Sequence, residues 1–396
     1  RLPFACYVNA GLSGMMVGDL NIPALKTKGQ PSTLTGSIGK ELLKEEMGFS
    51  GLTFTDGMAM RGVSNQSSMS VKAILAGNDI VLGVVNIRDE FNSVKEAVEQ
   101  NIISKELLER KVRKILSYKF ILDVHKFKPI DTHEVIRTIN NTNAEWLIRK
   151  LHDTSITLLK NDDDILPLKH LDKHKIASVS IGVSTITPFQ RWLNRYTDVK
   201  TFQINQSDQL AGIEKELSEY DEVIYSIHTQ YVKDTPAMQR MLKDQKSIVV
   251  FFTSPYFLNT FIQSSDKSRA VVLAHTNEVF AQESAAQALF GGIQMNGTIP
   301  VSAGKYKANT GLITDKSRLA YHLPEEVGID SEKLSSIERI ALEGIRQKAY
   351  PGCQILVAKD GVVIYDKSFG SFEYDVSSKV TEETVYDLAS ITNEAI

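Results

Sequence analysis

The sequence predicts an α/β protein made of three consecutive sections. Residues 1–130 alternate short apolar strands with amphipathic helices, a rhythm typical of parallel strands covered by helices. Residues 131–315 repeat this rhythm with apolar, β-branched strands. Residues 316–396 begin with a helical pattern and continue into two strands joined by a tight turn. The fold class predicted for the chain is therefore α/β.

The composition is that of a globular protein with room for several cores. The chain has 396 residues, of which 42% are hydrophobic and 23% charged, and this length predicts two or three domains. Lys+Arg 45 against Asp+Glu 48 gives a net charge of −3, which does not point to nucleic acid or an acidic membrane surface as partner. No apolar run reaches transmembrane length. Cys6 and Cys353 lie far apart without metal spacing, so we expect small buried side chains rather than disulfides.

The first section has only three strand–helix units. A closed parallel barrel takes eight strands and about 250 residues, so these residues predict either an open sheet or the C-terminal part of a TIM-type (β/α)8 barrel. The chain begins at Arg1 rather than Met and ends within a pattern, so we expect it to come from a longer parent. The expected strands are Gly14–Gly18, Leu52–Phe54 and Asp79–Leu82, and the expected helices are Ser37–Met47, Val71–Ala76, Val94–Val98 and Ser104–Phe120.

The second section follows a linker expected at Phe127–His133 and a helix over Asn143–Leu151. Its strands are apolar on both faces, which predicts a three-layer αβα sandwich. No glycine-rich phosphate loop follows any of them, so nucleotide binding has little support. The expected strands are Ser155–Leu159, Ile176–Ile181, Val223–Ile227, Ile248–Thr253, Ala270–Ala274 and the strand-like Thr298–Val301, with helices at Ser207–Leu217 and Thr276–Phe290.

The third section is expected to open near Tyr321. A helix is predicted over Ser331–Gln347, with its apolar residues on one face. Two strands, Gln354–Ala358 and Val362–Tyr365, flank the dipeptide Asp360-Gly361, and Asp-Gly between alternating strands is a strong hairpin signal.

One carboxylate stands out as a candidate catalytic residue. Asp56 follows the strand Leu52–Phe54 after one residue, Thr55, and the glycines Gly57 and Gly62 bracket its loop. Barrel enzymes keep their chemistry where a buried strand meets such a loop. The alternative is an ordinary strand-end Asp that caps the next helix.

Two histidines at strand ends have weaker claims. His228 and His275 both lie in the αβα section. For both, packing in a loop or core is the favoured interpretation over a functional role.

The first section resembles the C-terminal part of a glycoside hydrolase family 3 barrel, in its β-N-acetylglucosaminidase branch. The matching stretches are Ala10–Ala24, Gly48–Gly62 (Gly48-Phe-Ser-Gly-Leu-Thr-Phe-Thr-Asp-Gly-Met-Ala-Met-Arg-Gly62) and Ala76–Leu82. The resemblance implies a retaining exo-β-N-acetylglucosaminidase with Asp56 as catalytic nucleophile. It also implies a carbohydrate substrate with terminal β-linked N-acetylglucosamine, no metal or organic cofactor, and a periplasmic or cell-surface address in a bacterium. The second section resembles the domain that follows the barrel in many members, with Ala288–Val301 as its closing phrase.

The general acid of this reaction has no counterpart in the chain. In the branch that the chain resembles, the acid is a His–Asp pair on an earlier loop, and no Lys-His-(apolar)-Pro-Gly-His-Gly phrase occurs here. The β-glucosidase branch takes a Glu from the αβα domain, but Val223–Ile227 is followed by His228-Thr-Gln-Tyr-Val-Lys-Asp234, without Glu. We therefore expect the acid to belong to an earlier part of the barrel, since only 55 residues precede Asp56.

The third section resembles the opening of a serine-β-lactamase-like domain, through Glu326–Leu334, Pro351–Gly361 and Tyr386–Asn393, and this resemblance implies the truncated start of an α+β fold. The three-part order resembles a bacterial fusion protein. Related domains use Ser-x-x-Lys, in which the Lys helps to deprotonate the Ser. Here Ser390 is followed by Asn393, which has no basic nitrogen. Two alternatives thus stand beside the glycosidase: a serine esterase or peptidase that uses Ser390, and a catalytically silent fragment.

Overall fold

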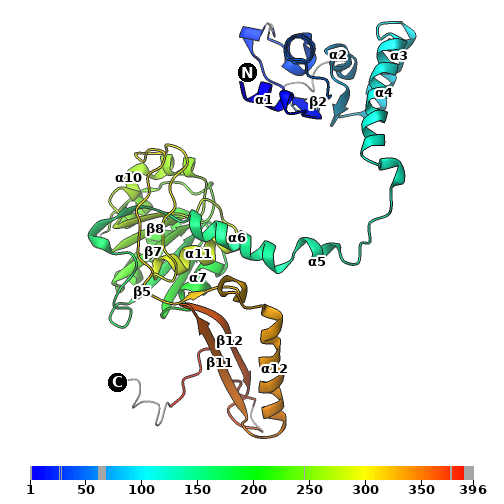
Figure 1. Cartoon of the computed structure of the whole chain (residues 1–396). Coiled ribbons are helices and arrows are strands. Elements are labelled where there is room, and N and C mark those ends of the chain that lie inside the picture. Colours follow the sequence, from blue (N-terminus) through cyan, green and yellow to red (C-terminus); the bar gives the residue numbers. More distant parts are fainter. Residues whose placement is uncertain are drawn as a thin grey trace. The chain divides into compact units, whose positions relative to one another are not determined.

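The computed structural model describes residues 2–25, 27, 29–60, 68–244, 246–374 and 377–387, without the side chains of residues 262 and 263. The chain folds into two compact units, Arg1–Asp131 and Thr132–Ile396 (Figure 1). Each unit has its own sheets and its own hydrophobic cores. Each is therefore described by itself.

The first unit is built on a small parallel sheet. Its strands lie in the order β1-β2-β3, and both neighbouring pairs are parallel. In the β1–β2 register, Gly14 lies opposite Leu52 and Val17 opposite Thr55. The regular elements are α1 (Leu2–Asn9), β1 (Gly14–Val17), the π-helix Ser37–Glu46, β2 (Leu52–Gly57), α2 (Met69–Leu75), β3 (Ile80–Leu82), α3 (Ile87–Glu99) and α4 (Lys105–Ile121), with 3-10 turns at Pro23–Leu25, Ser32–Leu34 and Val124–Lys126.

The predicted strand–helix rhythm of this unit is present, but the described residues form no closed barrel. Of the two arrangements that the sequence allowed, the structure has the open sheet, and the part-barrel stays a prediction. The predicted helix Ser37–Met47 differs in kind, because it winds as a π-helix in which the Met47 N–H donates to the Leu42 carbonyl. On this helix Gly39 lies against the Ala76 carbonyl, where an added Cβ would come within 2.9 Å.

The second unit contains a six-stranded sheet in the order β4-β9-β8-β7-β5-β6. All neighbouring pairs are parallel except β4 and β9. The elements of this sandwich are α5 (Val135–Ile139), α6 (Thr142–Ser155), β4 (Thr157–Asn161), β5 (Ile176–Ile181), α7 (Pro188–Leu193), β6 (Val199–Ile204), α8 (Glu214–Leu217), β7 (Glu222–Ile227), α9 (Pro236–Leu242), β8 (Ser247–Phe251), α10 (Ile262–Ser265), β9 (Ala270–Leu273) and α11 (Val279–Leu289), with 3-10 turns at Asp162–Asp164, Ser207–Gly212 and Pro255–Phe261.

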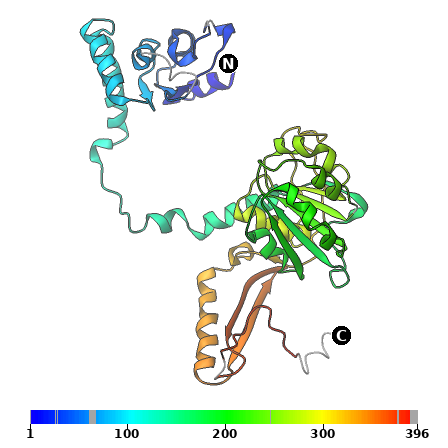
Figure 2. The same cartoon turned by 180° about the vertical axis from the view of Figure 1, so that it is seen from behind.

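Helices cover both faces of this sheet, because alternate residues of each buried strand point to opposite sides. Ile224 and Val250 pack with α7 and α11 on one face. Val223 and Val249 pack with α8 and α9 on the other face. The predicted three-layer arrangement of this section is therefore what the structure has (Figures 1 and 2).

The last part of the chain shares a core with the sandwich. Its elements are β10 (Ala320–Tyr321), the 3-10 turn Pro324–Val327, α12 (Ser331–Arg346), β11 (Gly352–Lys359) and β12 (Val362–Gly370). The strands form a second sheet, β10-β12-β11, with α12 beside the hairpin (Figure 2). Ala320, Val362 and Ile364 are buried in the same cluster as α7 and α11. The predicted three-domain division, 1–130, 131–315 and 316–396, stays a prediction.

Four local predictions were wrong. Thr298–Val301 is not a strand; Ile299 instead exchanges hydrogen bonds with the loop residues Asn309 and Thr310, and Pro300 has no N–H to donate. The single helix Ser207–Leu217 is a 3-10 turn and the short α8, which meet next to Gly212.

The other two errors concern an edge strand and the cysteines. Sequence analysis missed β6, the edge strand of the sandwich. Cys6 is exposed and Cys353 is half-buried, so neither is the buried side chain that we predicted. Both are free thiols.

Candidate active site

Asp56 lies at the carboxyl end of β2, the central strand of the first unit. The end of β2 is tied to β3, because the Leu82 N–H donates to Thr55 Oγ1 at 2.9 Å and the Met58 N–H to the Leu82 carbonyl at 3.0 Å. The Asp56 carboxylate is half-buried, and its Oδ1 accepts a hydrogen bond from the Gly57 N–H at 2.8 Å. The strand therefore presents this carboxylate at the sheet edge where parallel-sheet enzymes carry out their chemistry.

The helix-capping alternative for Asp56 is not what the described residues show. The next described helix, α2, begins at Met69 and has Ser68 at its N-cap position. The hydrogen bond of Asp56 Oδ1 is to its immediate neighbour Gly57 instead. Residues 61–67, which include Gly62 of the predicted bracket, lie outside the described residues.

A second carboxyl group, that of Asp19, belongs to the loop after β1 and is near enough to Asp56 for the two charges to interact. Asp19 follows β1, and an added Cβ on its neighbour Gly18 would lie 3.9 Å from Asp56 Oδ2. Asp19 Oδ1 accepts a hydrogen bond from the Thr33 hydroxyl, whereas Asp19 Oδ2 is buried and has no partner among the described residues. Burial raises the pKa of Asp19, the Thr33 hydrogen bond opposes this, and the charge of Asp56 raises it further.

A buried ionic cluster anchors the opposite end of β2. Asp79, which immediately precedes β3, accepts hydrogen bonds at 3.1 Å from the N–H and the hydroxyl of Thr53. Lys44, Lys111 and Lys114 all lie within 3.4 Å of its carboxylate, whose side chain is only 3% exposed. Burial opposes ionisation of Asp79, but the hydrogen bonds from Lys114 and Thr53 and the lysine charges lower its pKa to about 2.

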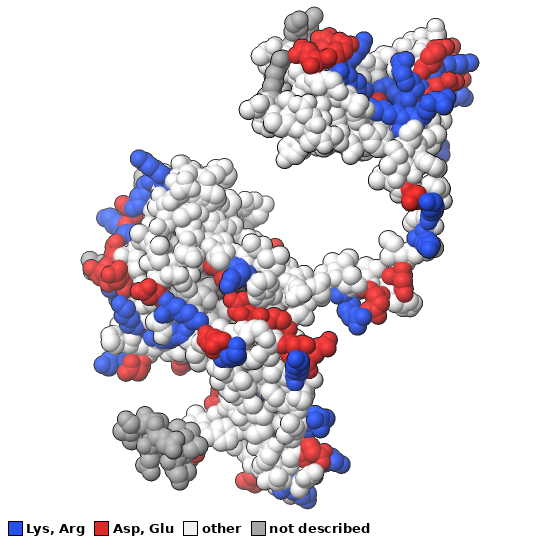
Figure 3. All heavy atoms as spheres, in the orientation of Figure 1, with Lys and Arg blue, Asp and Glu red and all other residues white. Residues whose placement is uncertain are grey.

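This lysine cluster holds the strands in place rather than offering a free cationic site. The ammonium of Lys111 also donates to the Asn78 carbonyl at 2.7 Å, and that of Lys44 to the Gly77 carbonyl at 2.6 Å. Figure 3 shows basic side chains grouped over the α3–α4 part of this unit. The lysines thus use their donors on backbone groups and Asp79.

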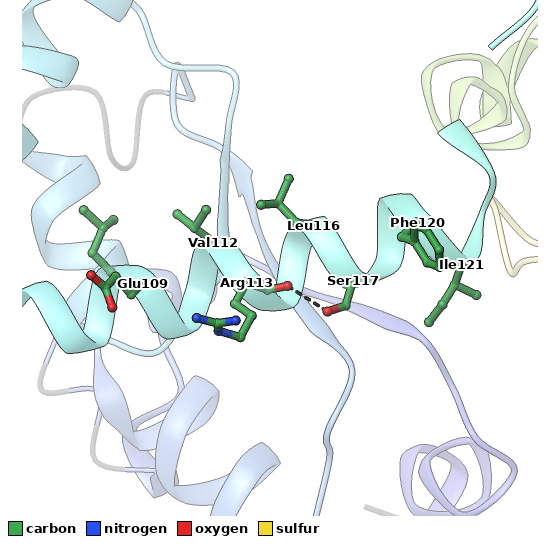
Figure 4. Close-up of a pocket in the computed structure, with 8 residues that line it drawn as sticks. Glu109, Val112, Arg113, Leu116, Ser117, Phe120 and Ile121 are labelled. Atoms are coloured by element: carbon green, nitrogen blue, oxygen red, sulfur yellow. Dashed lines mark hydrogen bonds between the residues drawn. The ribbon is translucent and has the colours of Figure 1, made fainter. Parts of the chain in front are cut away.

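A cavity of 720 Å³ runs along α4 and does not include Asp56. It is lined by side chains of this one helix, and Figure 4 shows Val112 and Leu116 pointing to the same side of it. The polar contact drawn there, Ser117 Oγ to the Arg113 carbonyl at 2.9 Å, stays within the helix. The cavity is therefore a mainly apolar surface of one helix, and Asp56 does not line it.

The histidines of the second unit have the structural roles that were favoured for them. His228 is 4% exposed, and both ring nitrogens are bonded: Nδ1 to Asn277 Oδ1 at 2.8 Å and Nε2 to Ser226 Oγ at 3.0 Å. His275 Nε2 lies 3.0 Å from Thr157 Oγ1. Burial lowers the pKa of both imidazoles, that of His228 to about 4.

Other features of the described residues bear on the remaining predictions. No helix among them has both the length and the apolar character needed to cross a membrane. Within the same residues, no group of three or more His, Cys, Asp or Glu is placed to hold a metal ion. Ser390 and Asn393 of the predicted serine site lie outside the described residues.

Comparisons with known proteins place the Asp56 segment in a family. Residues 1–118 match the glycosyl hydrolase family 3 N terminal domain. The segment that carries Asp19 and Asp56 thus matches this family's N-terminal domain, in agreement with the family expected for the first section.

Individual relatives carry different substrate names. The chain is 26% identical over 177 residues to a β-N-acetylglucosaminidase/β-glucosidase from Cellulomonas fimi, a match that covers 42% of this chain and 31% of the relative. It is 30% identical over 183 residues to a putative β-xylosidase from Formosa agariphila, covering 44% of this chain and 23% of the relative. These matches span less than a third of each relative's length.

Among solved structures, the chain is similar to a glycoside hydrolase family 3 β-N-acetylglucosaminidase from Paenibacillus sp. str. FPU-7. The TM-score is 0.61 at 21% sequence identity, and the match covers 78% of this chain and 61% of that one. At this identity the similarity shows the mixed α/β fold alone. The predicted order of part-barrel, sandwich and β-lactamase-like section stays a prediction.

Proposed function

We propose that the chain is part of a retaining β-glycosidase that removes terminal β-linked N-acetylglucosamine, with Asp56 as its nucleophile. The observation that carries the proposal is the position of Asp56, at the carboxyl end of the central strand in a glycoside hydrolase family 3 segment. Its Oδ1 is bonded to the Gly57 N–H, which leaves Oδ2 for the substrate. Support for N-acetylglucosamine comes from the sequence resemblance and from the names of two relatives.

In this mechanism an Asp56 oxygen attacks the anomeric carbon and forms a glycosyl-enzyme ester, while the leaving group departs with a proton from an acid. Water then attacks the same carbon and releases the Asp56 carboxylate. The sugar keeps its β configuration because two inversions take place. We place the parent protein in the periplasm or at the cell surface of a bacterium, in line with the sequence resemblance.

Hydrolysis of activated aryl glycosides tests the proposal. The substrate is 2,4-dinitrophenyl β-N-acetylglucosaminide, whose leaving group needs little help from an acid. Asp56→Asn should lower kcat/KM by about 10³-fold or more because the nucleophile is lost. Asp123→Asn is the matched control, since it removes a carboxylate that is 61% exposed at the end of α4; its kcat/KM should equal that of the wild type.

Two further measurements bear on mechanism and sugar. A 5-fluoro-β-N-acetylglucosaminyl fluoride should add one sugar to the chain, on the peptide that contains Asp56. The β-glucoside and β-xyloside of the same phenol should react more slowly than the N-acetylglucosaminide. A label on another residue would contradict the role of Asp56, and a faster glucoside or xyloside would contradict the proposed sugar.

A further inference from the structure

We propose that the second unit holds a binding site for one neutral sugar unit, between α7 and the β10-β12-β11 sheet. The site is a cavity of 200 Å³ whose lining includes Arg195, Tyr321 and Asp366. The inference goes beyond the proposed function, because it concerns the unit that does not contain Asp56. Only the choice of a sugar, among neutral molecules with hydroxyl groups, rests on the proposed glycosidase function.

Three polar side chains from different segments meet at this cavity. Arg195 follows α7, Tyr321 ends β10 and Asp366 belongs to β12. The Arg195 guanidinium lies 5.0 Å from the centroid of the Tyr321 ring, and its Nη1 lies 3.9 Å from Asp366 Oδ2. Burial raises the pKa of the Tyr321 hydroxyl, which the charge of Arg195 lowers and that of Asp366 raises further. The hydroxyl is therefore close to both charged groups.

Each of these groups has hydrogen-bonding capacity that the protein does not use. Within the described part of the chain, the Arg195 guanidinium, the Tyr321 hydroxyl and the Asp366 carboxylate make no hydrogen bond. The ion-pair partners of Arg195, which are Asp366 and Glu382, both stay at 3.9 Å, beyond hydrogen-bond range. Asp366 Oδ1 is enclosed, so we assign the ligand contact to Oδ2, beside Arg195.

The walls of the cavity hold the polar groups in place. The Arg195 guanidinium lies 5.0 Å from the Trp192 centroid as well, and the rings of Trp192 and Tyr321 meet edge to face at 6.1 Å between centroids. Ile364, two positions before Asp366 and thus on the same face of β12, is buried in the core shared with α7 and α11. Groups that are already fixed lose little entropy when a ligand binds.

The charges around the cavity favour a neutral ligand. Arg149 also lines it, but its guanidinium is paired with Glu283 at 2.6 Å. An anion would be repelled by Asp366 and Glu382, and an ammonium group by Arg195. A hydroxyl group suits both sides, because it accepts a hydrogen bond from the guanidinium and donates one to the carboxylate.

The size of the cavity sets the length of the ligand. Pockets for drug-sized molecules have about 300–1,000 Å³, and this one has 200 Å³. It is therefore suited to a single sugar ring. Adjacent hydroxyl groups on such a ring would reach Arg195, Tyr321 and Asp366 together, while its C–H groups contact the apolar wall that Trp192 and Ile364 provide.

The indole N–H signals of the two tryptophans test the site without any turnover, in NMR spectra of the full chain. Trp192 lines the cavity, whereas Trp146 does not and donates to Glu326 Oε2 at 2.5 Å. The methyl β-glycosides of N-acetylglucosamine, glucose and xylose are titrated in turn. At least one should shift the Trp192 signal with a millimolar Kd, as expected for a ligand of about 15 heavy atoms, and leave the Trp146 signal in place.

Two variants locate the bound sugar. Asp366→Asn and Arg195→Gln should each raise the Kd by about 10-fold or more, because each removes a charged hydrogen-bond partner. Asp360→Asn is the matched control, since its carboxylate is 71% exposed at the turn of the same hairpin and Asn tolerates the positive φ there. Its Kd should equal that of the wild type. An unchanged Trp146 signal in each variant shows that the unit is folded.

The proposal is overturned if no glycoside at about 100 mM moves the Trp192 signal, which would mean that water alone fills the cavity. It is also overturned if Asp366→Asn and Arg195→Gln bind as the wild type does, or if methyl β-glucuronide binds more tightly than the glucoside. Labelling of Asp56 is an independent measurement. If it fails while Trp192 responds, the proposed function is refuted and the sugar site stands; the reverse result refutes the sugar site alone.

Discussion

Acidification should weaken the second unit through one imidazole, that of His228. Its ring is stacked on Phe252 at 4.7 Å between ring centroids and is bonded at both nitrogens. Gln282 Nε2 also donates to Asn277 Oδ1, so His228 Nδ1 is the nitrogen that carries the proton and Nε2 accepts from Ser226. The folded unit thus holds a neutral imidazole in a nearly water-free site.

The size of the effect follows from the two pKa values. The folded unit lowers the pKa of His228 from 6.5 to about 4. Above pH 6.5 both states are neutral and nothing changes. Between pH 6.5 and about 4 the unfolded chain binds a proton at His228 and the folded unit does not, so the free energy of unfolding decreases as the pH is lowered. Below about pH 4 both states are protonated, and this contribution no longer changes. At about 1.4 kcal/mol per pKa unit, the total loss is about 3 kcal/mol.

The assay is urea unfolding at pH values from 7 to 4, followed by tryptophan fluorescence. The chain has two tryptophans, Trp146 and Trp192, and both belong to the second unit, so the signal reports that unit. His228→Asn removes the titrating group. At each pH, the free energy of unfolding of the variant is subtracted from that of the wild type. This difference should decrease by about 3 kcal/mol from pH 7 to pH 4, because titrating carboxylates that both proteins share contribute equally to the two values.

A matched control is His170→Asn, which removes an exposed imidazole at a positive-φ position that Asn tolerates. Its pH curve should follow that of the wild type. Parallel curves for wild type and His228→Asn would refute the reasoning, because the neutral state of His228 would then contribute nothing to the pH dependence.

Two further predictions concern the cores. Asp79→Asn should destabilise the first unit by about 3–5 kcal/mol, since it leaves buried lysine charges without their partner; hydrogen exchange of the β1–β3 amides should speed up, while Asp123→Asn should leave it unchanged. Ile364→Ala should lower the urea midpoint of the tryptophan signal by an amount that corresponds to about 2–5 kcal/mol, because Ile364 fills the core under α7 and α11. An unchanged midpoint would mean that the last section does not support the sandwich.

The elements predicted best from the sequence are those whose signal lies within a few neighbouring residues. Ile176–Ile181 was placed with its correct bounds, because all six of its residues are buried and four of them are apolar. β6 was missed because an edge strand mixes buried and exposed positions, as in Val-Lys-Thr-Phe-Gln-Ile. The hairpin around Asp360-Gly361 was found through its turn, where both residues have positive φ.

The site was only half visible in the sequence. Asp56 could be found from its strand and its neighbours, but only the β1–β2 register shows that Asp19 follows its strand at the same sheet edge. The rule that singled out Asp56, a carboxylate just after an apolar strand, applies equally to Asp19 and would have found it. The lysines around Asp79 lie 32 to 35 positions from it in the chain, and no local pattern brings them together.

The common core of the sandwich and the last section limits how this protein can be divided. Val362 and Ile364 lie more than 70 residues beyond α11, yet both complete the core against it. Two hydrogen bonds add to this contact: the Arg318 guanidinium donates to the Phe290 carbonyl, and the Tyr321 N–H donates to Gln287 Oε1. A truncation or gene fusion with its junction near residue 315 would therefore uncover apolar surface on α7 and α11. Recombination is better tolerated near Asp131, where the two compact units meet in sequence.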